Sequence, residues 1–205
     1  MRSDLIKQME ENKLFAVIRG DNFEDGYSKS IAVLKGGINI LEITFTTPDA
    51  DLLISKLVEQ FKNNKTVLVG AGTVLDETSA RIAILRGAKF IVAPSFNPKV
   101  AEICNLYSIP YIPGAMTIEN IEEALKSGCE IVKIFPASSL GPSFIKSIKG
   151  PIPQVRIMVT GGINLNNAID YIKAGAMLIG TGSDLTKGNS EEITKKAKDY
   201  VNLLK

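Results

Sequence analysis

The stretch Ser127–Phe135 reads SGCEIVKIF, and it takes the chain from the end of a helix into an apolar strand. Glycine in the position after a helix accepts the left-handed conformation, so Gly128 predicts a helix stop. The same change from helix to strand recurs at Lys35-Gly36-Gly37-Ile38, Arg86-Gly87-Ala88-Lys89 and Ala174-Gly175-Ala176-Met177. Strands that alternate with helices in this way predict a parallel sheet.

Eight strands are expected from the apolar runs, at Leu14–Arg19, Ile38–Thr44, Thr66–Ala71, Phe90–Pro94, Pro110–Pro113, Ile131–Phe135, Arg156–Thr160 and Met177–Thr181. Between them lie amphipathic segments with apolar residues at helical spacing, such as Asp49–Phe61, Glu77–Leu85, Pro98–Tyr107 and Ile118–Lys126. Eight such units close into a (β/α)₈ TIM barrel. We predict its short form, with Met1–Asn12 as an extra N-terminal helix outside the repeat. An open doubly wound sheet is the alternative.

The composition restricts the class of protein. The 205 residues, 45% of them hydrophobic, are enough for one domain spanning 1–205. The net charge is +2 and no basic run is interleaved with aromatic residues, so we expect no nucleic-acid partner. No apolar run approaches the ~20 residues that a membrane span needs, and the N-terminus lacks the core of a signal peptide. We therefore expect a cytoplasmic protein without a membrane partner.

Two residue types restrict the chemistry. The chain has no histidine, which excludes Ser-His-Asp and Cys-His nucleophile systems and leaves carboxylates, lysine, tyrosine and water to move protons. Cys104 and Cys129 lack the spacing of metal ligands and are too few for a disulfide framework. We interpret them as small core residues in a reducing compartment.

A lysine lies in the middle of the apolar strand Ile131–Phe135. An ammonium buried without a partner is costly, so some other group must compensate Lys133. Alternate residues of a barrel strand point inward, which places Lys133 inside the barrel. By the same alternation Glu42, Thr44 and Thr46 point inward from the second strand. A buried salt bridge without catalysis is the alternative interpretation of the lysine and the glutamate.

Further polar groups are expected at the C-terminal mouth of the barrel, where TIM-barrel enzymes place their reactive groups. Val17 and Arg19 share the inward face of the first strand. On the third strand we expect Val69, Ala71 and Thr73 to point inward. A guanidinium and a hydroxyl thereby join the buried pair, and a merely structural ion pair has no need of them.

Two glycine clusters follow the last two strands, Thr160-Gly161-Gly162-Ile163 and Gly180-Thr181-Gly182-Ser183. Backbone N–H groups at such clusters can approach an anion, and barrels frequently bind phosphate in this place. We interpret both clusters as a phosphate site; tight strand-to-helix turns are the alternative. For Gly70-Ala71-Gly72-Thr73 a tight turn after the third strand is an equally good explanation.

Taken together, the motifs resemble those of the family of 2-keto-3-deoxy-6-phosphogluconate (KDPG) and 4-hydroxy-2-oxoglutarate (KHG) aldolases. The matching segments are Leu41-Glu42-Ile43-Thr44, Gly70-Ala71-Gly72-Thr73-Val74, Ile112-Pro113-Gly114, Lys133-Ile134-Phe135-Pro136-Ala137, Gly150-Pro151, Thr160-Gly161-Gly162-Ile163 and Gly180-Thr181-Gly182-Ser183. The similarity runs nearly end to end. It implies a class I, Schiff-base aldolase on a short barrel, usually a homotrimer, with no metal and no cofactor.

The resemblance also implies a substrate. Members split KDPG, a phosphorylated 2-keto acid, into pyruvate and glyceraldehyde 3-phosphate, and many also split KHG into pyruvate and glyoxylate. Two other functions stay open: an aldolase for the galactonate epimer, and a non-catalytic barrel that binds a phosphosugar. The intact Lys133 and Glu42 argue against the second.

Roles for single residues follow from the same resemblance. Lys133 matches the Schiff-base lysine, and its apolar strand favours the neutral, nucleophilic amine. Glu42 matches the general acid/base. The matched substrate-binding residues are Thr73 at the pyruvate carboxylate, Pro94 and Phe135 around the pyruvyl group, Thr160 near the substrate, and Gly161, Gly162, Gly182 and Ser183 at the phosphate.

One position departs from the family pattern. Many members carry an arginine two residues beyond the threonine of the second strand, where it holds the substrate carboxylate, and here that position is Thr46. Arg19 ends the neighbouring strand at the same mouth, and arginine binds carboxylates bidentately. We expect Arg19 to replace the missing arginine. An exposed arginine at a strand end, without a role, is the alternative.

Overall fold

The computed structural model describes residues 2–204, whose parallel strands form a closed barrel. The strands are β1 (Leu14–Ile18), β2 (Ile40–Thr44), β3 (Leu68–Gly72), β4 (Ile91–Val92), β5 (Tyr111–Ile112), β6 (Gly114–Ala115), β7 (Ile131–Ile134), β8 (Arg156–Thr160) and β9 (Leu178–Thr181). Their order is β5-β4-β3-β2-β1-β9-β8-β7-β6. Only Pro113 separates β5 from β6, so the sheet closes on itself. The predicted (β/α)₈ barrel is confirmed, with its fifth strand divided in two.

Pro113 explains that division. Proline has no N–H to donate to the ladder, so the strand is interrupted at this residue. Its carbonyl still accepts a hydrogen bond from the Lys133 N–H at 2.8 Å. The interruption therefore leaves β7, which carries the lysine, paired with the fifth strand.

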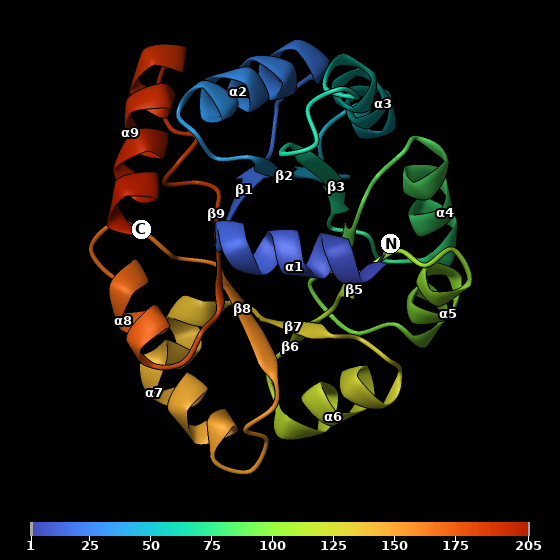
Figure 1. Ribbon diagram of the computed structural model, residues 1–205, viewed down its shortest axis with the longest axis vertical. Helices are drawn as coiled ribbons and strands as arrows, with labels where there is room; N and C mark the ends of the chain where they lie inside the picture. Colours follow the sequence, from blue (N-terminus) through green and yellow to red (C-terminus); the bar gives the residue numbers. More distant parts are fainter. Residues whose placement is uncertain (1, 205) are drawn as a thin grey trace.

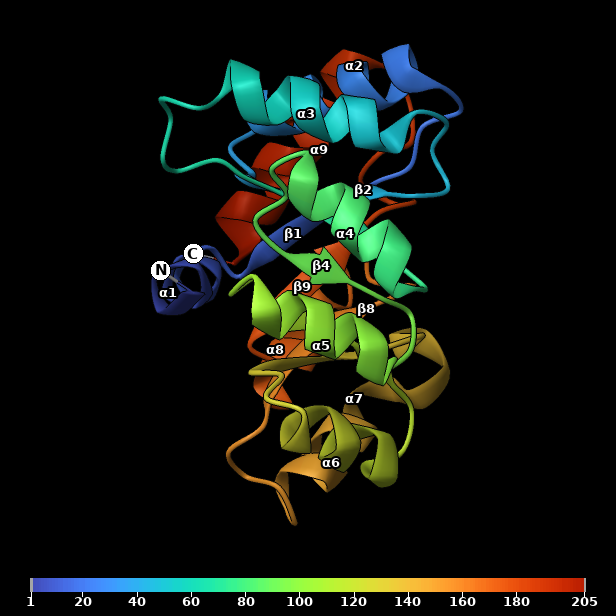
Figure 2. The same ribbon diagram turned by 90° about the vertical axis from the view of Figure 1, so that its right-hand side faces the viewer.

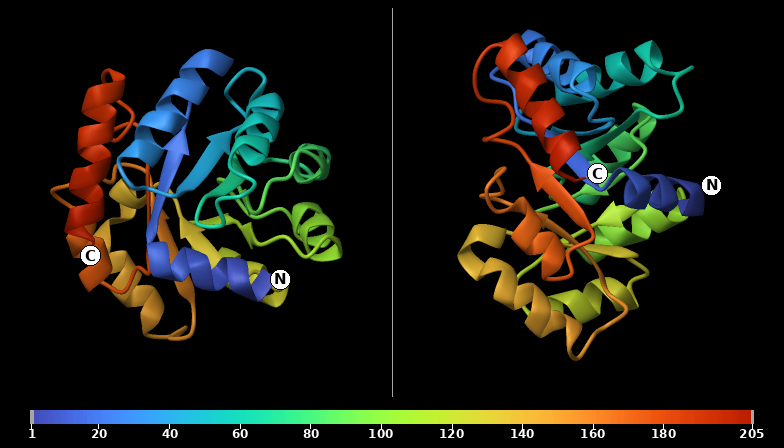
Figure 3. Two further views of the ribbon diagram at one scale, coloured as in Figure 1. Left: turned by 45° about the horizontal axis from the view of Figure 1, so that its top comes forward. Right: turned by 60° about the vertical axis from the view of Figure 1, so that its left-hand side comes forward.

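The helices form a ring around the strands (Figure 1). The ring consists of α2 (Phe23–Lys35), α3 (Ala50–Gln60), α4 (Glu77–Leu85), α5 (Pro98–Leu106), α6 (Ile118–Lys126), α7 (Ala137–Lys149), α8 (Ala168–Lys173) and α9 (Ser190–Leu203), and α1 (Arg2–Asn12) is not part of it. The predicted glycine stops are confirmed, because Gly37, Gly87, Gly128 and Gly175 all have φ between 79° and 108°. The last helix, α9, packs beside α2 and completes the ring (Figure 3).

The N-terminal helix α1 lies outside this ring and covers the N-terminal mouth of the barrel (Figure 2). Its buried residues, Ile6 and Met9, pack onto an apolar layer inside the barrel, the floor layer, formed by Phe15, Ile40, Leu68, Phe90, Val92, Ile112, Ile131, Met158 and Leu178. Burying each large apolar side chain contributes ~1.5–3 kcal/mol. Ion pairs fasten the helix at its edges, with Arg2 2.9 Å from Glu130 and Glu10 3.1 Å from Arg156.

The prediction for the inward face of β3 is wrong. Val69 and Ala71 belong to the core cluster between the strands and the helices, so they face outward. The interior positions are Gly70 and Gly72. A Cβ at Gly70 would lie 2.5 Å from the ring of Phe90, which already fills the space that a β3 side chain would take.

Candidate active site

A lysine and a glutamate meet across the interior of the barrel. The Lys133 ammonium nitrogen lies 3.5 Å from Glu42 Oε1, and the two side chains are only 6% and 1% exposed. They come from β7 and β2, which are not neighbours in the sheet, so the contact spans the barrel. The predicted inward placement of both residues is confirmed. A charged pair with so little solvent is costly unless its remaining polar atoms find partners.

One carboxylate oxygen of the glutamate has no hydrogen-bond partner within the described part of the protein. This oxygen, Glu42 Oε2, is buried. A Cβ at Gly72 would lie 2.4 Å from Oε1, so the glycine at this inward position leaves room for the carboxylate. An unsatisfied buried acceptor costs roughly 1–3 kcal/mol and is often explained by a ligand or water. The free oxygen is therefore available to a substrate hydroxyl or a water.

A cavity of ≈ 410 Å³ opens at the C-terminal mouth. The predicted site residues that line it are Arg19, Phe135, Thr160, Gly161, Gly162, Gly182 and Ser183. Phe135 connects it with the buried pair, because its ring centroid is 5.2 Å from the lysine nitrogen. The Thr160 hydroxyl is buried without a partner, as Glu42 Oε2 is. The strand ends thus bring most of the predicted residues together.

Backbone geometry requires two of the cavity's glycines. Gly161 and Gly162 have φ of 92° and 75°, which favour glycine. A Cβ at Gly162 would also lie 2.4 Å from the Ser138 Cβ. The tight-turn explanation therefore holds for this cluster, and the turn also lines the cavity, so the two interpretations do not exclude one another.

Arg19 is held by a chain of threonines. Its Nε donates to Thr46 Oγ1 at 3.1 Å, Thr46 donates to Thr44 Oγ1 at 3.0 Å, and Thr44 donates to the Ile18 carbonyl at 3.1 Å. The sequence did not predict the Arg19–Thr46 contact. The contact could have been predicted, because both residues were expected on the inward faces of adjacent strands. The residue in place of the family's arginine thus supports an arginine on the next strand.

Thr73 and Pro94 belong neither to the buried pair of Lys133 and Glu42 nor to the cavity lining. They follow β3 and β4 at the same mouth of the barrel, yet neither lines the cavity. Thr73 has φ 56°, so the strand alternation does not determine where its side chain points. Pro94 packs its carbonyl against the fifth strand, where a Cβ at Gly114 would lie 1.9 Å from it.

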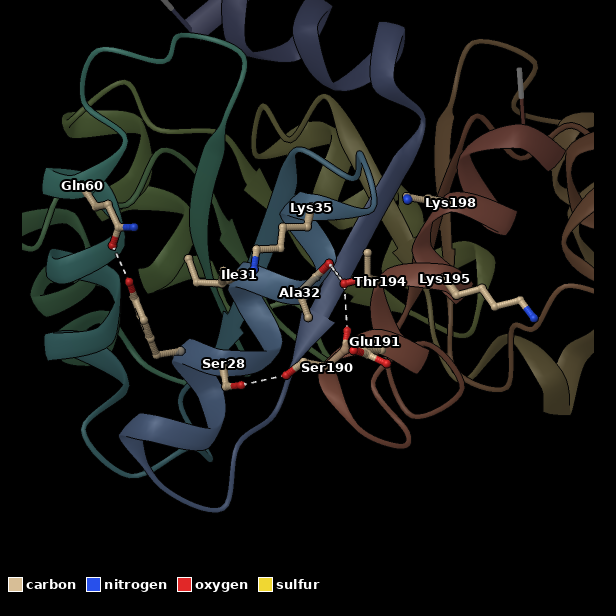
Figure 4. A pocket seen from close by; sticks show the side chains of 11 residues that line it. Ser28, Ile31, Ala32, Lys35, Gln60, Ser190, Glu191, Thr194, Lys195 and Lys198 are labelled. Carbon is tan, nitrogen blue, oxygen red and sulfur yellow. Dashed lines mark hydrogen bonds between the residues drawn. The ribbon is translucent and has the colours of Figure 1, made fainter.

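A larger cavity of ≈ 640 Å³ lies on the outside of the barrel, between α2 and α9, away from the C-terminal mouth (Figure 4). None of the predicted site residues lines it. Its hydroxyls have partners within the protein: Ser28 Oγ lies 3.2 Å from Ser190 Oγ, and Thr194 donates to the Ala32 carbonyl at 2.9 Å. Lys35, Lys195 and Lys198 are among the residues that line it (Figure 4). It is a groove between two helices of the ring, separate from the cavity at the C-terminal mouth.

Residues 2–204 contain neither a cluster of metal-ligating side chains nor a helix that could span a membrane. No group of three or more Asp, Glu or Cys side chains is placed to hold a metal ion there. No helix in this range has the length and apolar character to cross a membrane. Cys104 and Cys129 are buried and unpaired, as expected. Burial raises the pKa of both thiols to about 12, so they stay protonated.

Known proteins share this sequence and fold. The family model described as KDPG and KHG aldolase matches residues 5–203. The 2-dehydro-3-deoxy-phosphogluconate aldolase of Treponema pallidum (strain Nichols) is 35% identical over 187 residues, which cover 91% of this chain and 88% of the relative. The 2-dehydro-3-deoxy-6-phosphogalactonate aldolase of Escherichia coli (strain K12) is 31% identical and covers 88% of each chain.

A solved structure adds a chemical detail. The KDPG aldolase from Legionella pneumophila, with pyruvate captured at low pH as a covalent carbinolamine intermediate, superposes with a TM-score of 0.82. It is 30% identical, and the match covers 91% of this chain and 92% of that one. A carbinolamine is the adduct that forms when an amine attacks a carbonyl, so that protein carries a reactive amine.

Proposed function

The chain belongs to the KDPG and KHG aldolase family, and we propose that it is a class I aldolase that cleaves KDPG to pyruvate and glyceraldehyde 3-phosphate. The proposal includes a second reaction, the cleavage of KHG to pyruvate and glyoxylate. The observation that carries the proposal is the buried contact of Lys133 with Glu42 behind the cavity wall formed by Phe135. Such a site holds a nucleophile and a proton carrier away from water.

The reaction begins at the lysine. The neutral Lys133 amine attacks the C2 carbonyl of the substrate to give a carbinolamine, which loses water to become an iminium. Glu42 takes the proton of the C4 hydroxyl, the C3–C4 bond breaks, and its electron pair passes to the iminium as an enamine. The aldehyde leaves. Protonation of the enamine at C3 and hydrolysis of the iminium then release pyruvate and restore the amine.

The two anionic groups of the substrate have separate partners in this proposal. The C1 carboxylate binds Arg19, which the Thr46 hydroxyl orients, and Thr73 binds the same carboxylate. Pro94 and Phe135 surround the pyruvyl group, and Thr160 offers its unpaired hydroxyl. The phosphate binds the backbone N–H groups of the glycine clusters together with Ser183, in the way that strand-to-helix turns bind anions.

We also propose a cytoplasmic homotrimer. A group of exposed apolar side chains on α4, α5 and the neighbouring loops supports self-association, because stable subunit interfaces bury such side chains. Its residues are Leu75 (57% exposed), Ile82 (39%), Leu85 (67%), Leu106 (72%), Tyr107 (41%) and Met116 (46%). Light scattering of the purified protein measures the number of subunits, and Leu106→Asp at the most exposed position should shift it to monomer.

The experiment that tests the mechanism is reductive trapping. Pyruvate and borohydride should add a reduced pyruvyl group to Lys133, which intact-mass and peptide mass spectrometry detect. Lys133→Met should abolish both the adduct and turnover. A wild-type protein of unchanged mass, or an adduct that persists in Lys133→Met, would rule out the Schiff base at this lysine.

The galactonate epimer is a second candidate substrate, because a relative named for that substrate covers 88% of this chain. The two epimers differ at C4, where the bond breaks. Assaying pure KDPG and its galactonate epimer side by side gives the ratio of their kcat/KM values. A higher kcat/KM for the galactonate compound would reassign the substrate and leave the Schiff-base mechanism intact.

A further inference from the structure

We propose that Tyr200, on the outer helix α9, is a positioning residue that holds the two phosphate-binding loops together. The inference rests on the proposed function for the glycine clusters. Tyr200 does not line the cavity, and its side chain is fully buried behind it. It acts through the loops that follow β8 and β9, without touching substrate.

The hydroxyl of Tyr200 lies where the two loops meet. It donates to Asp184 Oδ2 at 2.7 Å, in the loop after β9, and it accepts from Thr181 Oγ1 at 3.2 Å. The Ile163 carbonyl, in the loop after β8, is 3.3 Å from Thr181 Oγ1 and 3.5 Å from the tyrosine oxygen. One phenol therefore connects the segment next to Gly162 with the segment next to Ser183.

The direction of these bonds is fixed by the number of protons. A tyrosine hydroxyl has one proton, and the short contact to a carboxylate makes Asp184 its acceptor. Burial raises the pKa of Tyr200, so the phenol keeps that proton at neutral pH. The Thr181 proton is then left for the Ile163 carbonyl and the tyrosine oxygen.

The network also controls a negative charge beside the phosphate site. Asp184 follows Ser183 in the chain but does not line the cavity. The Lys196 ammonium holds it from the other side, donating to its carbonyl at 2.6 Å and lying 3.8 Å from Oδ1. With Tyr200 and Lys196 in place the carboxylate stays turned away from an incoming dianion. Loss of the phenol frees it to approach, since its side chain is 35% exposed.

Tyr200 offers a cleaner test of the phosphate site than the glycines do. Replacing Gly162 would force a Cβ against Ser138 at a φ of 75°, so any loss would report strain in the turn. Tyr200→Phe keeps the ring that packs in the core and removes only the hydroxyl. Tyr27→Phe is the matched control, because its hydroxyl binds Gln60 at 2.9 Å on the outer surface, away from the loops.

The experiment compares two substrates and one ligand. For Tyr200→Phe we expect KM for KDPG to rise ~10-fold, the scale of one charge-assisted hydrogen bond, while kcat/KM for the unphosphorylated KHG stays within ~2-fold. Calorimetry should show weaker binding of inorganic phosphate by the same ~10-fold. Tyr27→Phe should match the wild type in all three measurements.

Each outcome decides the inference. Equal loss on KDPG and KHG would make Tyr200 a general structural residue, and unchanged KM and phosphate affinity would remove its role. A wild type that binds no phosphate would likewise overturn it. If the wild type turned over neither substrate, the aldolase proposal would fail, and the phosphate titration of Tyr200→Phe against Tyr27→Phe would still decide this inference.

Discussion

The two halves of the barrel interior are built by the same strands and have opposite chemistry. In the floor layer, next to α1, every strand except β6 contributes an apolar residue in or beside it, such as Phe15 and Ile131. One inward position further along, the same strands carry polar groups, such as Lys133 on β7 and Glu42 on β2. Two residues of strand therefore separate the part of the interior that stabilises the fold from the part proposed to react.

The two halves of the interior contribute differently to the free energy of folding. The floor layer is sealed by α1 and has no unsatisfied polar atom among its side chains, so its burial stabilises the barrel. The mouth layer, Arg19, Glu42, Thr44, Lys133 and Thr160, contains two buried oxygens without partners, on Glu42 and Thr160. Such groups are destabilising in the free protein and are expected where a ligand completes the site.

The largest effect should come from the floor layer. Phe90→Ala removes a fully buried ring that packs edge-on against Phe15 at 5.3 Å. We expect a loss of about 3–5 kcal/mol in the free energy of unfolding, measured by urea denaturation. The kcat of the fraction that remains folded should stay within ~3-fold of the wild type, since the mouth layer keeps its residues. A large fall in that kcat with a normal free energy of unfolding would contradict the assignment of stability to the floor layer and of turnover to the mouth layer.

In the mouth layer, Glu42→Gln should act on turnover rather than on stability. The amide keeps the size of the side chain and cannot carry the proton, so we expect kcat to fall about 10²-fold or more. The pyruvate adduct on Lys133 should still form under borohydride. Steady-state kinetics and mass spectrometry measure the two effects separately, and near-normal turnover would remove Glu42 from the reaction.

Arg19→Ala sharpens the division within the mouth itself. Loss of one charge-assisted contact to the carboxylate, worth roughly 1.5–3 kcal/mol, should reduce kcat/KM about 10- to 150-fold. KDPG and KHG should suffer alike, because both carry the carboxylate. Arg19 lines the same cavity as the glycine clusters. A loss of kcat/KM for KDPG alone would therefore show that Arg19 binds the phosphate and not the carboxylate.

Removal of metal ions should have no effect on the activity. The proposed reaction uses an amine and a carboxylate, so dialysis against EDTA should leave kcat/KM unchanged. The assay is turnover of KDPG before and after dialysis, with zinc and magnesium added back in turn. Loss of activity that zinc restores would contradict the reaction as written.

The sequence predicted most of this architecture because helix stops and apolar runs are local signals. The apolar runs predicted the eight strands, the glycines marked four of the helix ends, and the alternation on β7 and β2 placed Lys133 and Glu42 inside. On β3 the same reasoning failed. Val69 and Ala71 share the alternation of Thr73, which predicts that they point inward with it, but the interior positions are Gly70 and Gly72.

The parts of the site that the sequence did not show are set by distant residues. The ring of Phe90, directly before β4, fills the space beside Gly70 on the inward face of β3. The contact of Arg19 with Thr46, and that of Tyr200 with Asp184, join residues 27 and 16 positions apart. Local periodicity gives the direction of a side chain, and it carries no information about which neighbour has left room for it.

The close approach of Phe90 to Gly70 has a consequence for how the sequence can change. The ring occupies the volume that a side chain at Gly70 would need, so only one of the two positions can carry a large side chain. Enlarging Gly70 alone produces a collision, and shrinking Phe90 alone leaves a void. Relatives should therefore vary at these positions in a correlated way, with a larger residue at one accompanied by a smaller residue at the other. A designer who wished to repack this end of the barrel would have to exchange both residues together.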